Sequence, residues 1–144
     1  MKKLLYVVVL GIVIFGFFAN NPNFLQPNVE QSQTTGQRLA NAYENQQSNV
    51  QVSGEGRVIH ILPDDNRGSR HQKFLLELPS GQTLLISHNI DVAARINSLR
   101  EGDTVEFYGE YEWNPQGGVV HWTHHDPGGR HENGWLKHKG TNYQ

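Results

Sequence analysis

Three of the eight histidines in this sequence lie within five residues, beside a tryptophan. They are His121, His124 and His125, followed by Asp126, at the end of what the pattern predicts to be the last strand. Imidazoles and carboxylates are the ligands that zinc and other divalent metals take when thiolates are absent, and the chain has no cysteine. A bound metal with an open coordination position lowers the pKa of a water ligand. The cluster therefore raises the hypothesis of a metal-dependent hydrolytic site.

The spacing within the cluster argues against a site made by these histidines alone. Residues four apart on a straight strand are separated by about 13 Å, so His121 and His125 cannot share one ion. No predicted helix carries a His-x-x-x-His ligand pair. The alternative is a structural role, in which His121 and His125 pair with glutamates and His124 is buried and hydrogen-bonded.

The elements that must position these residues are short strands separated by turn signals. We predict strands at 52–62, 71–78, 82–88, 103–113 and 118–125. A short helix is expected after the third strand, beginning at Asn89 or Asp91 and ending at Gly102. Three strands, a helix and two strands predict a mainly β protein, a small five-stranded OB-type barrel. A partly open β-sandwich is the alternative.

The turns set the register of the two predicted hairpins. A three-residue turn at 79–81 pairs Phe74 with Ile86 and Leu76 with Leu84. A four-residue loop at 114–117 gives the pairs Tyr111–Val120, Gly109–Trp122 and Phe107–His124 on the inner face, and Glu110–His121 and Glu106–His125 on the outer face. This register puts Trp122 in the core. A slip of one residue would move each of these side chains to the other face.

Barrel topology would gather more of the histidines at one rim. The third and fifth strands of an OB-type barrel are parallel, so their C-terminal ends lie together, and the second strand starts at the same end. The residues expected there are His71, His88, His124, His125, Asp126 and Glu106. These histidines, His121 and Asp126 are the candidate ligands of zinc or another divalent metal, and Glu106 and Asp126 are the candidate catalytic residues. The tail, with His131 and His138, begins at this rim and could fold over it.

Other side chains suit a binding role. Lys73 and Arg70 lie near the first loop of the predicted barrel and could hold an anion. Tyr108 and Trp113 offer aromatic faces for stacking. OB-type barrels bind oligonucleotides or oligosaccharides on such surfaces. The net charge of -2 over 144 residues does not indicate nucleic acid as the partner, since a basic face is the usual sign, but it leaves that partner open.

The N-terminal third has a different composition. Lys2 and Lys3 precede an uncharged run at 4–19, which predicts a signal anchor or signal peptide over residues 1–20. An Ala-x-Ala cleavage pattern is missing, so we favour an uncleaved anchor. Residues 21–49 are polar and predict a disordered linker, in which 37–43 could form a brief helix. The barrel is expected at 50–127, and a His- and Gly-rich tail at 128–144.

Several motifs resemble those of one known family. They are His71-Gln72-Lys73-Phe74, His88-Asn89-Ile90-Asp91, Gly109-Glu110-Tyr111-Glu112-Trp113-Asn114, the run 117–127, and then His131, Gly134 and Trp135. The family consists of short exported bacterial proteins classed as a domain of unknown function, and the similarity covers about residue 51 to the C-terminus. The resemblance implies that the candidate metal ligands belong to the family's pattern. It implies no activity.

Three functions remain open at this point. The first is a binding module on the outer side of a bacterial inner membrane, held by the single N-terminal span and presenting its rim to an extracytoplasmic ligand. If the span is cleaved, the domain is released to the periplasm. The second is a divalent-metal-dependent hydrolase of the phosphodiesterase or nuclease type. The third is a pH-responsive interaction surface, because clustered histidines change charge between pH 5 and 8. Whether the protein is an enzyme stays undecided.

Overall fold

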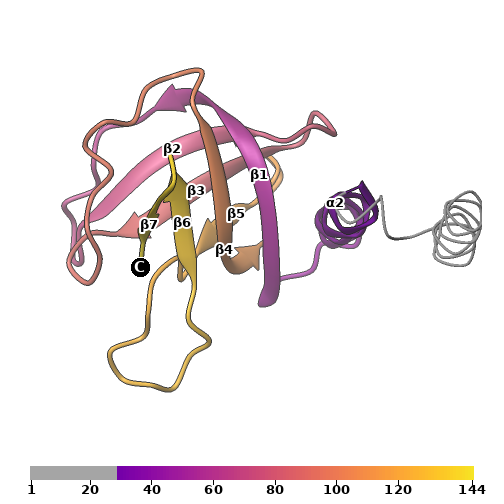
Figure 1. Ribbon diagram of the computed structural model, residues 1–144. Coiled ribbons are helices and arrows are strands. Elements are labelled where there is room, and N and C mark those ends of the chain that lie inside the picture. The colour runs from indigo at the N-terminus through magenta and orange to yellow at the C-terminus, as the bar shows by residue number, and fades with distance from the viewer. Residues whose placement is uncertain (1–28) are drawn as a thin grey trace, which may run out of the picture. The chain divides into compact units, whose positions relative to one another are not determined.

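A computed structural model of the protein describes residues 29–144, with side chains from Thr34 onward. Its elements are α2 (Val29–Glu44), β1 (Val50–Ile61), β2 (His71–Glu77), β3 (Thr83–Asn89), β4 (Thr104–Glu112), β5 (Val119–His121), β6 (Trp135–His138) and β7 (Thr141–Tyr143) (Figure 1). The compact unit that holds the strands spans Thr34–Gln144. The predicted anchor at 1–20 lies outside the described residues. Within 29–144, no helix combines the length and the apolar character that crossing a membrane requires.

Five strands form a closed barrel in the order β1-β2-β3-β5-β4, and β4 returns to pair with β1. All of these pairs are antiparallel except β3 with β5, which is parallel. This is the topology expected of an OB-type barrel, so the predicted fold class is confirmed. The long strand β1 pairs with both β2 and β4, and its register with β2 shifts at an irregularity between Val58 and His60.

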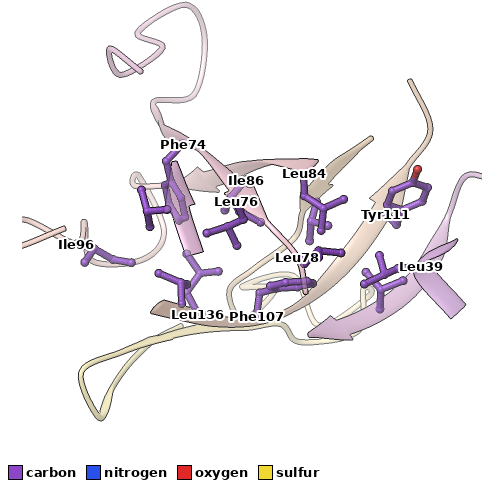
Figure 2. Packing of buried hydrophobic residues seen from close by; sticks show 14 of the residues in the cluster. Leu39, Phe74, Leu76, Leu78, Leu84, Ile86, Ile96, Phe107, Tyr111 and Leu136 are labelled. Carbon is purple, nitrogen blue, oxygen red and sulfur yellow. The ribbon is translucent and has the colours of Figure 1, made fainter. Parts of the chain in front are cut away.

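Alternate residues of the strands fill the barrel. β2 and β3 each show buried side chains at every second position, which is the period of a strand with one face in the core. Phe74 pairs with Ile86 and Leu76 with Leu84, as the three-residue turn predicted. Figure 2 shows these side chains meeting Phe107 and Leu136 inside the barrel.

The prediction that the last strand continues to residue 125 is wrong, because β5 ends at His121. Tyr111 faces Val120 and Glu110 faces His121 as expected, but β5 ends there. Trp122, the next residue, has a φ of 54°, a left-handed backbone that does not continue a strand. The chain leaves the sheet as the loop 122–134 and returns as β6.

The strand β6 takes the place along β4 that the sequence predicted for residues 124 and 125. Phe107 therefore faces Leu136 instead of His124, and Glu106 faces Lys137 instead of His125. Gly134 makes this return possible, because a Cβ at that position would lie 2.0 Å from the Trp122 carbonyl oxygen and 2.5 Å from that of Tyr108. The tail is thus part of the sheet, where β6 and β7 form a hairpin.

The helix predicted between the third and fourth strands is replaced by turns. Only one bond of helical spacing forms at its expected start, from the Ala93 N–H to the Asn89 carbonyl. Instead, the backbone of Ile96 forms two hydrogen bonds with the buried side-chain amide of Gln72. Its carbonyl accepts from Nε2 and its N–H donates to Oε1. This side chain competes successfully with the helix because it satisfies both polar groups of Ile96 in the barrel interior. Val92, expected on the apolar helix face, is 41% exposed.

A helix occupies most of the segment that we expected to be a disordered linker. α2 is longer than the brief helix considered at 37–43, and its residues Leu39 and Ala42 are each only 1% exposed. Leu39 lies in the same apolar cluster as the barrel side chains (Figure 2). Two apolar residues three positions apart lie on one helix face. The apolar side chains of the barrel cover Leu39 and Ala42, and this packing stabilises a helix that is otherwise polar.

Candidate functional site

His88 forms part of a buried polar group at the end of the barrel. Its side chain is fully buried, with Nδ1 2.8 Å from Thr123 Oγ1 and Nε2 3.1 Å from the Ala94 carbonyl oxygen. Because a carbonyl only accepts, Nε2 donates and Nδ1 accepts from the Thr123 hydroxyl. Burial lowers the pKa of His88 from 6.5 to about 4. His88 is therefore a neutral imidazole with both nitrogens in use.

The other histidines of the predicted rim are only partly brought together. His71 and His124 lie close enough to His88 for their charges to contribute to lowering its pKa. His71 Nδ1 bonds to the Ser69 carbonyl, and the buried His124 bonds through Nδ1 to the carbonyl of His125, whose side chain is exposed. Across residues 29–144, no three histidine, aspartate or glutamate side chains are arranged to hold a metal ion.

Asp126 organises the loop 122–134. Its carboxylate accepts hydrogen bonds of 2.8–2.9 Å from the backbone N–H groups of Gly128, Arg130 and His131. These three bonds lower the pKa of Asp126, since they favour the charged carboxylate. Its own N–H donates to Asn133. Asp126 thus stabilises the fold of the loop. Glu106, the other catalytic candidate, lies on β4 with Oε2 3.9 Å from Lys137 Nζ.

The proposed anion-binding cations are largely engaged by acidic side chains. Arg70 binds Asp91, with 2.7 Å between Nε and Oδ1. The same kind of pairing joins Arg57 to Glu77, Arg67 to Asp65 and Arg95 to Asp64. Lys73 lies on β2 opposite Ser87. The region around the first barrel loop therefore offers few unpaired positive charges to a ligand.

A histidine that we did not assign to the site closes the loop 122–134 onto the outer face of β4. His131 Nε2 lies 2.6 Å from Glu110 Oε2, and Nδ1 lies 2.8 Å from the Glu132 carbonyl oxygen. Its ring stacks on Trp122 with 4.0 Å between centroids and 7° between planes. A carbonyl and a carboxylate are both acceptors, so both ring nitrogens donate when Glu110 is ionised, and His131 is then an imidazolium.

Electrostatics agree with this assignment. Burial works to lower the pKa of His131, but the hydrogen bonds to Glu132 and Glu110 and the negative charges of Glu110 and Asp126 outweigh it and raise the pKa. Trp122, which we expected in the core, is instead the partly exposed base on which this imidazolium rests. His121, expected to pair with Glu110, lies 3.4 Å from Glu112.

A second feature of the same outer face is a pocket between α2 and strands β1 and β4. It has a volume of about 280 Å³ and is lined by Thr34, Thr35, Arg38, Gln51, Ser53 and Tyr108. Gln51 and Ser53 lie on β1 opposite Glu110 and Tyr108, so the strand register itself brings these polar groups together. The Tyr108 hydroxyl donates to Glu132, and its ring lies 6.3 Å from that of Trp135.

Tyr108 is therefore the one aromatic ligand candidate of the sequence that lines the pocket. Trp113 packs partly buried against the core, and its backbone N–H donates to Ser48 Oγ.

The family model described as "Protein of unknown function (DUF3465)" matches residues 24–144. The chain belongs to this family. The expected membership in a family of unknown function is thus confirmed, and the match to the DUF3465 family begins before residue 51, so that it includes α2 and the pocket residues. No curated protein matches the chain.

The sequence analysis did not assign Arg38, Trp122 or His131 to the candidate site. The sequence did contain a signal for the return of the loop 122–134, which carries Trp122 and His131, to the sheet. Asp126 followed by Pro127, Gly128 and Gly129 marks a turn, and a turn there lets the chain come back to the sheet. The alternation of Leu136 and His138, both buried, then fits a further strand.

We expect Glu110→Gln to lower the pKa of His131 toward or below its ordinary value of about 6.5, because the amide has no negative charge and keeps only one acceptor oxygen of the two. Because the pKa of His131 is higher in the folded than in the unfolded protein, protonation of its ring stabilises the folded loop. This stabilisation is fully present below about pH 6.5 and is lost as the pH rises through the folded-state pKa. The measurement is an NMR titration of the His131 ring. Glu112→Gln is the matched control on the same strand and should leave that pKa unchanged. Equal pKa values in wild type and Glu110→Gln would contradict the assignment.

Proposed function

We propose that this protein is an extracytoplasmic binding module, held at a bacterial inner membrane by its N-terminal segment, whose ligand site is the pocket between α2 and the outer face of β1 and β4. The observation that carries the proposal is the polar lining of this pocket of about 280 Å³, in which Arg38 is a cation without an ion pair to another described side chain, while Arg57, Arg67, Arg70 and Arg95 each bind an acid. A concave site with a few polar groups and one charged residue is the usual form of a small-molecule site.

The charge distribution supports a small ligand over a nucleic acid. The net charge is -2, and four arginines of the barrel are paired with acids. A nucleic acid needs a continuous basic surface. Metal-dependent hydrolysis is not proposed, because His88, His124 and His138 bond to Thr123, backbone carbonyls and Asp103, and the described residues contain no three-ligand group.

The binding function is tested with the full-length protein in detergent micelles. Its backbone amide resonances are followed while a panel of neutral, anionic and cationic polar solutes is added. We expect at least one solute to move the resonances of Gln51, Ser53 and Tyr108 together and saturably. Changes confined to the loops 62–70 and 113–118 would move the site to another face of the barrel. If no solute changes any resonance, the binding function is wrong.

The membrane tether is tested in cells. The two lysines ahead of the uncharged run place the N-terminus inside, so the domain should lie outside. We expect the full-length protein in the membrane fraction after a high-salt wash, and we expect protease added to spheroplasts to digest its domain. A protease-protected domain would contradict this orientation. Recovery from the periplasm without the first twenty residues would show that the segment is cleaved.

A second function, a pH-responsive interaction surface, is favoured by the Glu110–His131 pair. When His131 loses a proton, it keeps only one of its two donated hydrogen bonds. The acidic groups that act on it are Glu110 on β4 and Asp126 within its own loop, and the loop also carries Glu132, which binds Tyr108 at the pocket. Proton loss would thus weaken the contact between the loop and the face that carries the pocket. Partner or ligand affinity that changes with the titration of His131, and that Glu110→Gln shifts in pH, would support this function.

A further inference from the structure

We infer that the pocket takes a sugar acid, that is, a monosaccharide-sized molecule with one carboxylate and several hydroxyl groups. This inference rests on the proposed binding function and specifies its ligand. Three properties of the pocket carry it: the kind of charge it contains, the hydrogen-bonding character of its opposite wall, and its size.

The charge comes from Arg38. It is the only ionisable cation or carboxylate among the six lining residues that the structure describes. No ion pair joins its guanidinium to another side chain within the described residues, whereas Arg57, Arg67, Arg70 and Arg95 each bind an acid. A guanidinium binds a carboxylate through two parallel hydrogen bonds, which gives both attraction and orientation. The pocket therefore has a place for one anionic group.

The wall formed by β1 and β4 carries groups that pair with hydroxyls. The side chain of Gln51 lines the pocket, but its Oε1 is buried below the surface and does not face a ligand. The Tyr108 hydroxyl donates its hydrogen bond to Glu132, so its oxygen can only accept a hydrogen bond from a ligand in the pocket. The Ser53 hydroxyl, opposite Tyr108 on β1, can accept or donate. Hydroxyl groups of a ligand match these acceptors, and plain carboxylic acids without hydroxyls would leave them unsatisfied.

The size favours a small ligand. The pocket volume of about 280 Å³ lies just below the usual range for small-molecule pockets, about 300–1,000 Å³. A single sugar unit is of this size. A nucleotide or an oligosaccharide could place only one of its units inside.

Three probes of nearly equal size and different charge test the inference, namely D-gluconate, D-glucose and D-glucosamine. Each is titrated into the full-length protein in detergent micelles while the amide resonances of Gln51, Ser53 and Tyr108 are followed. We expect gluconate to bind at least tenfold more tightly than glucose and glucosamine. Arg38→Gln should weaken gluconate binding at least tenfold and remove most of the preference for gluconate over glucose, since a hydrogen bond to a charged group is worth more than one to a neutral group.

The control variant is Arg67→Gln, an identical substitution of an arginine on the first barrel loop, whose side chain is 95% exposed. It should leave gluconate binding unchanged. Ser53→Ala should reduce the preference for gluconate over succinate, an acid without hydroxyls, because the hydroxyl that pairs with a ligand hydroxyl is gone.

The outcomes separate the inference from the function on which it rests. Equal binding of the three probes, or gluconate binding that is insensitive to Arg38→Gln, would overturn the sugar-acid assignment while the pocket remains a binding site. Preferred binding of glucosamine would overturn it in favour of a cationic ligand. If none of these probes binds and the wider solute panel also leaves every resonance unchanged, both the inference and the binding function are wrong.

Discussion

The free energy of unfolding is expected to fall by about 3 kcal/mol between pH 7 and pH 4 because of His88 alone. Burial lowers its pKa from 6.5 to about 4 in the folded protein. An unfolded histidine titrates near 6.5, so in this interval the unfolded chain binds a proton that the folded chain does not. Each unit of pKa difference corresponds to about 1.4 kcal/mol. Stability is therefore fully present above pH 6.5, falls as the pH decreases, and levels off below about pH 4.

The measurement is urea-induced unfolding of the full-length protein at a series of pH values, together with the ring resonances of His88. The ring should stay neutral down to about pH 5. The double variant His88→Leu with Thr123→Val removes the titrating group and the hydroxyl to which it bonds. It should be less stable at pH 7, because the Ala94 carbonyl loses its donor, but its acid dependence should be smaller by about 3 kcal/mol.

His125→Gln is the control for this experiment, since the His125 side chain is exposed. It should keep the acid dependence of the wild type. The assignment fails if the double variant loses stability in acid as steeply as the wild type. His131 contributes in the opposite direction because its pKa is raised, so the Glu110→Gln titration is needed to separate the two histidines.

Leu39→Ala is expected to destabilise the domain by about 2–5 kcal/mol. Leu39 is 1% exposed, and removing a buried leucine side chain costs both its transfer free energy and the cavity left behind. A residue of a flexible linker would cost less than about 0.5 kcal/mol in the same substitution. The result therefore decides whether α2 belongs to the domain. Thermal or urea unfolding of the full-length protein provides the value.

Two further variants bracket this prediction. Leu39→Met keeps the volume and should cost less than about 1.5 kcal/mol. Val92→Ala shortens an apolar side chain that is 41% exposed and should cost less than about 0.5 kcal/mol. A loss below 1 kcal/mol in Leu39→Ala would mean that α2 does not pack on the barrel. The pocket would then lack the wall that carries Arg38.

The success of the fold prediction has a local cause. The alternation of apolar and polar residues in β2 and β3, with a three-residue turn between them, leaves one register that buries Phe74, Leu76, Leu84 and Ile86 together. The parallel contact of β3 with β5 then follows from the order of the elements. These are patterns within about twenty residues, and a sequence shows them directly.

The failures share a different cause. The pattern of 118–125 fits a strand by itself, but the edge of β4 at Val105–Tyr108 is taken by β6, which buries Leu136 and His138 there. Likewise α2 is too polar to be stable as an isolated helix, and the barrel stabilises it by covering Leu39 and Ala42. In both cases two distant segments compete for, or share, one surface.

The amino-acid sequence by itself determined the fold class, the family resemblance, the strands β1 to β4, and the fact that β5 follows a turn and runs beside β3. It also determined that the chemistry rests on histidines, carboxylates and aromatic rings, because no cysteine is present. Only the tertiary structure decided which of these groups meet. It placed the neutral, buried His88 in a hydrogen bond with Thr123, brought His131 to Glu110, and brought Arg38 and Gln51 to one pocket. The physical reason is that a side chain's role depends on its burial and its partners, and these come from contacts between residues distant in the chain.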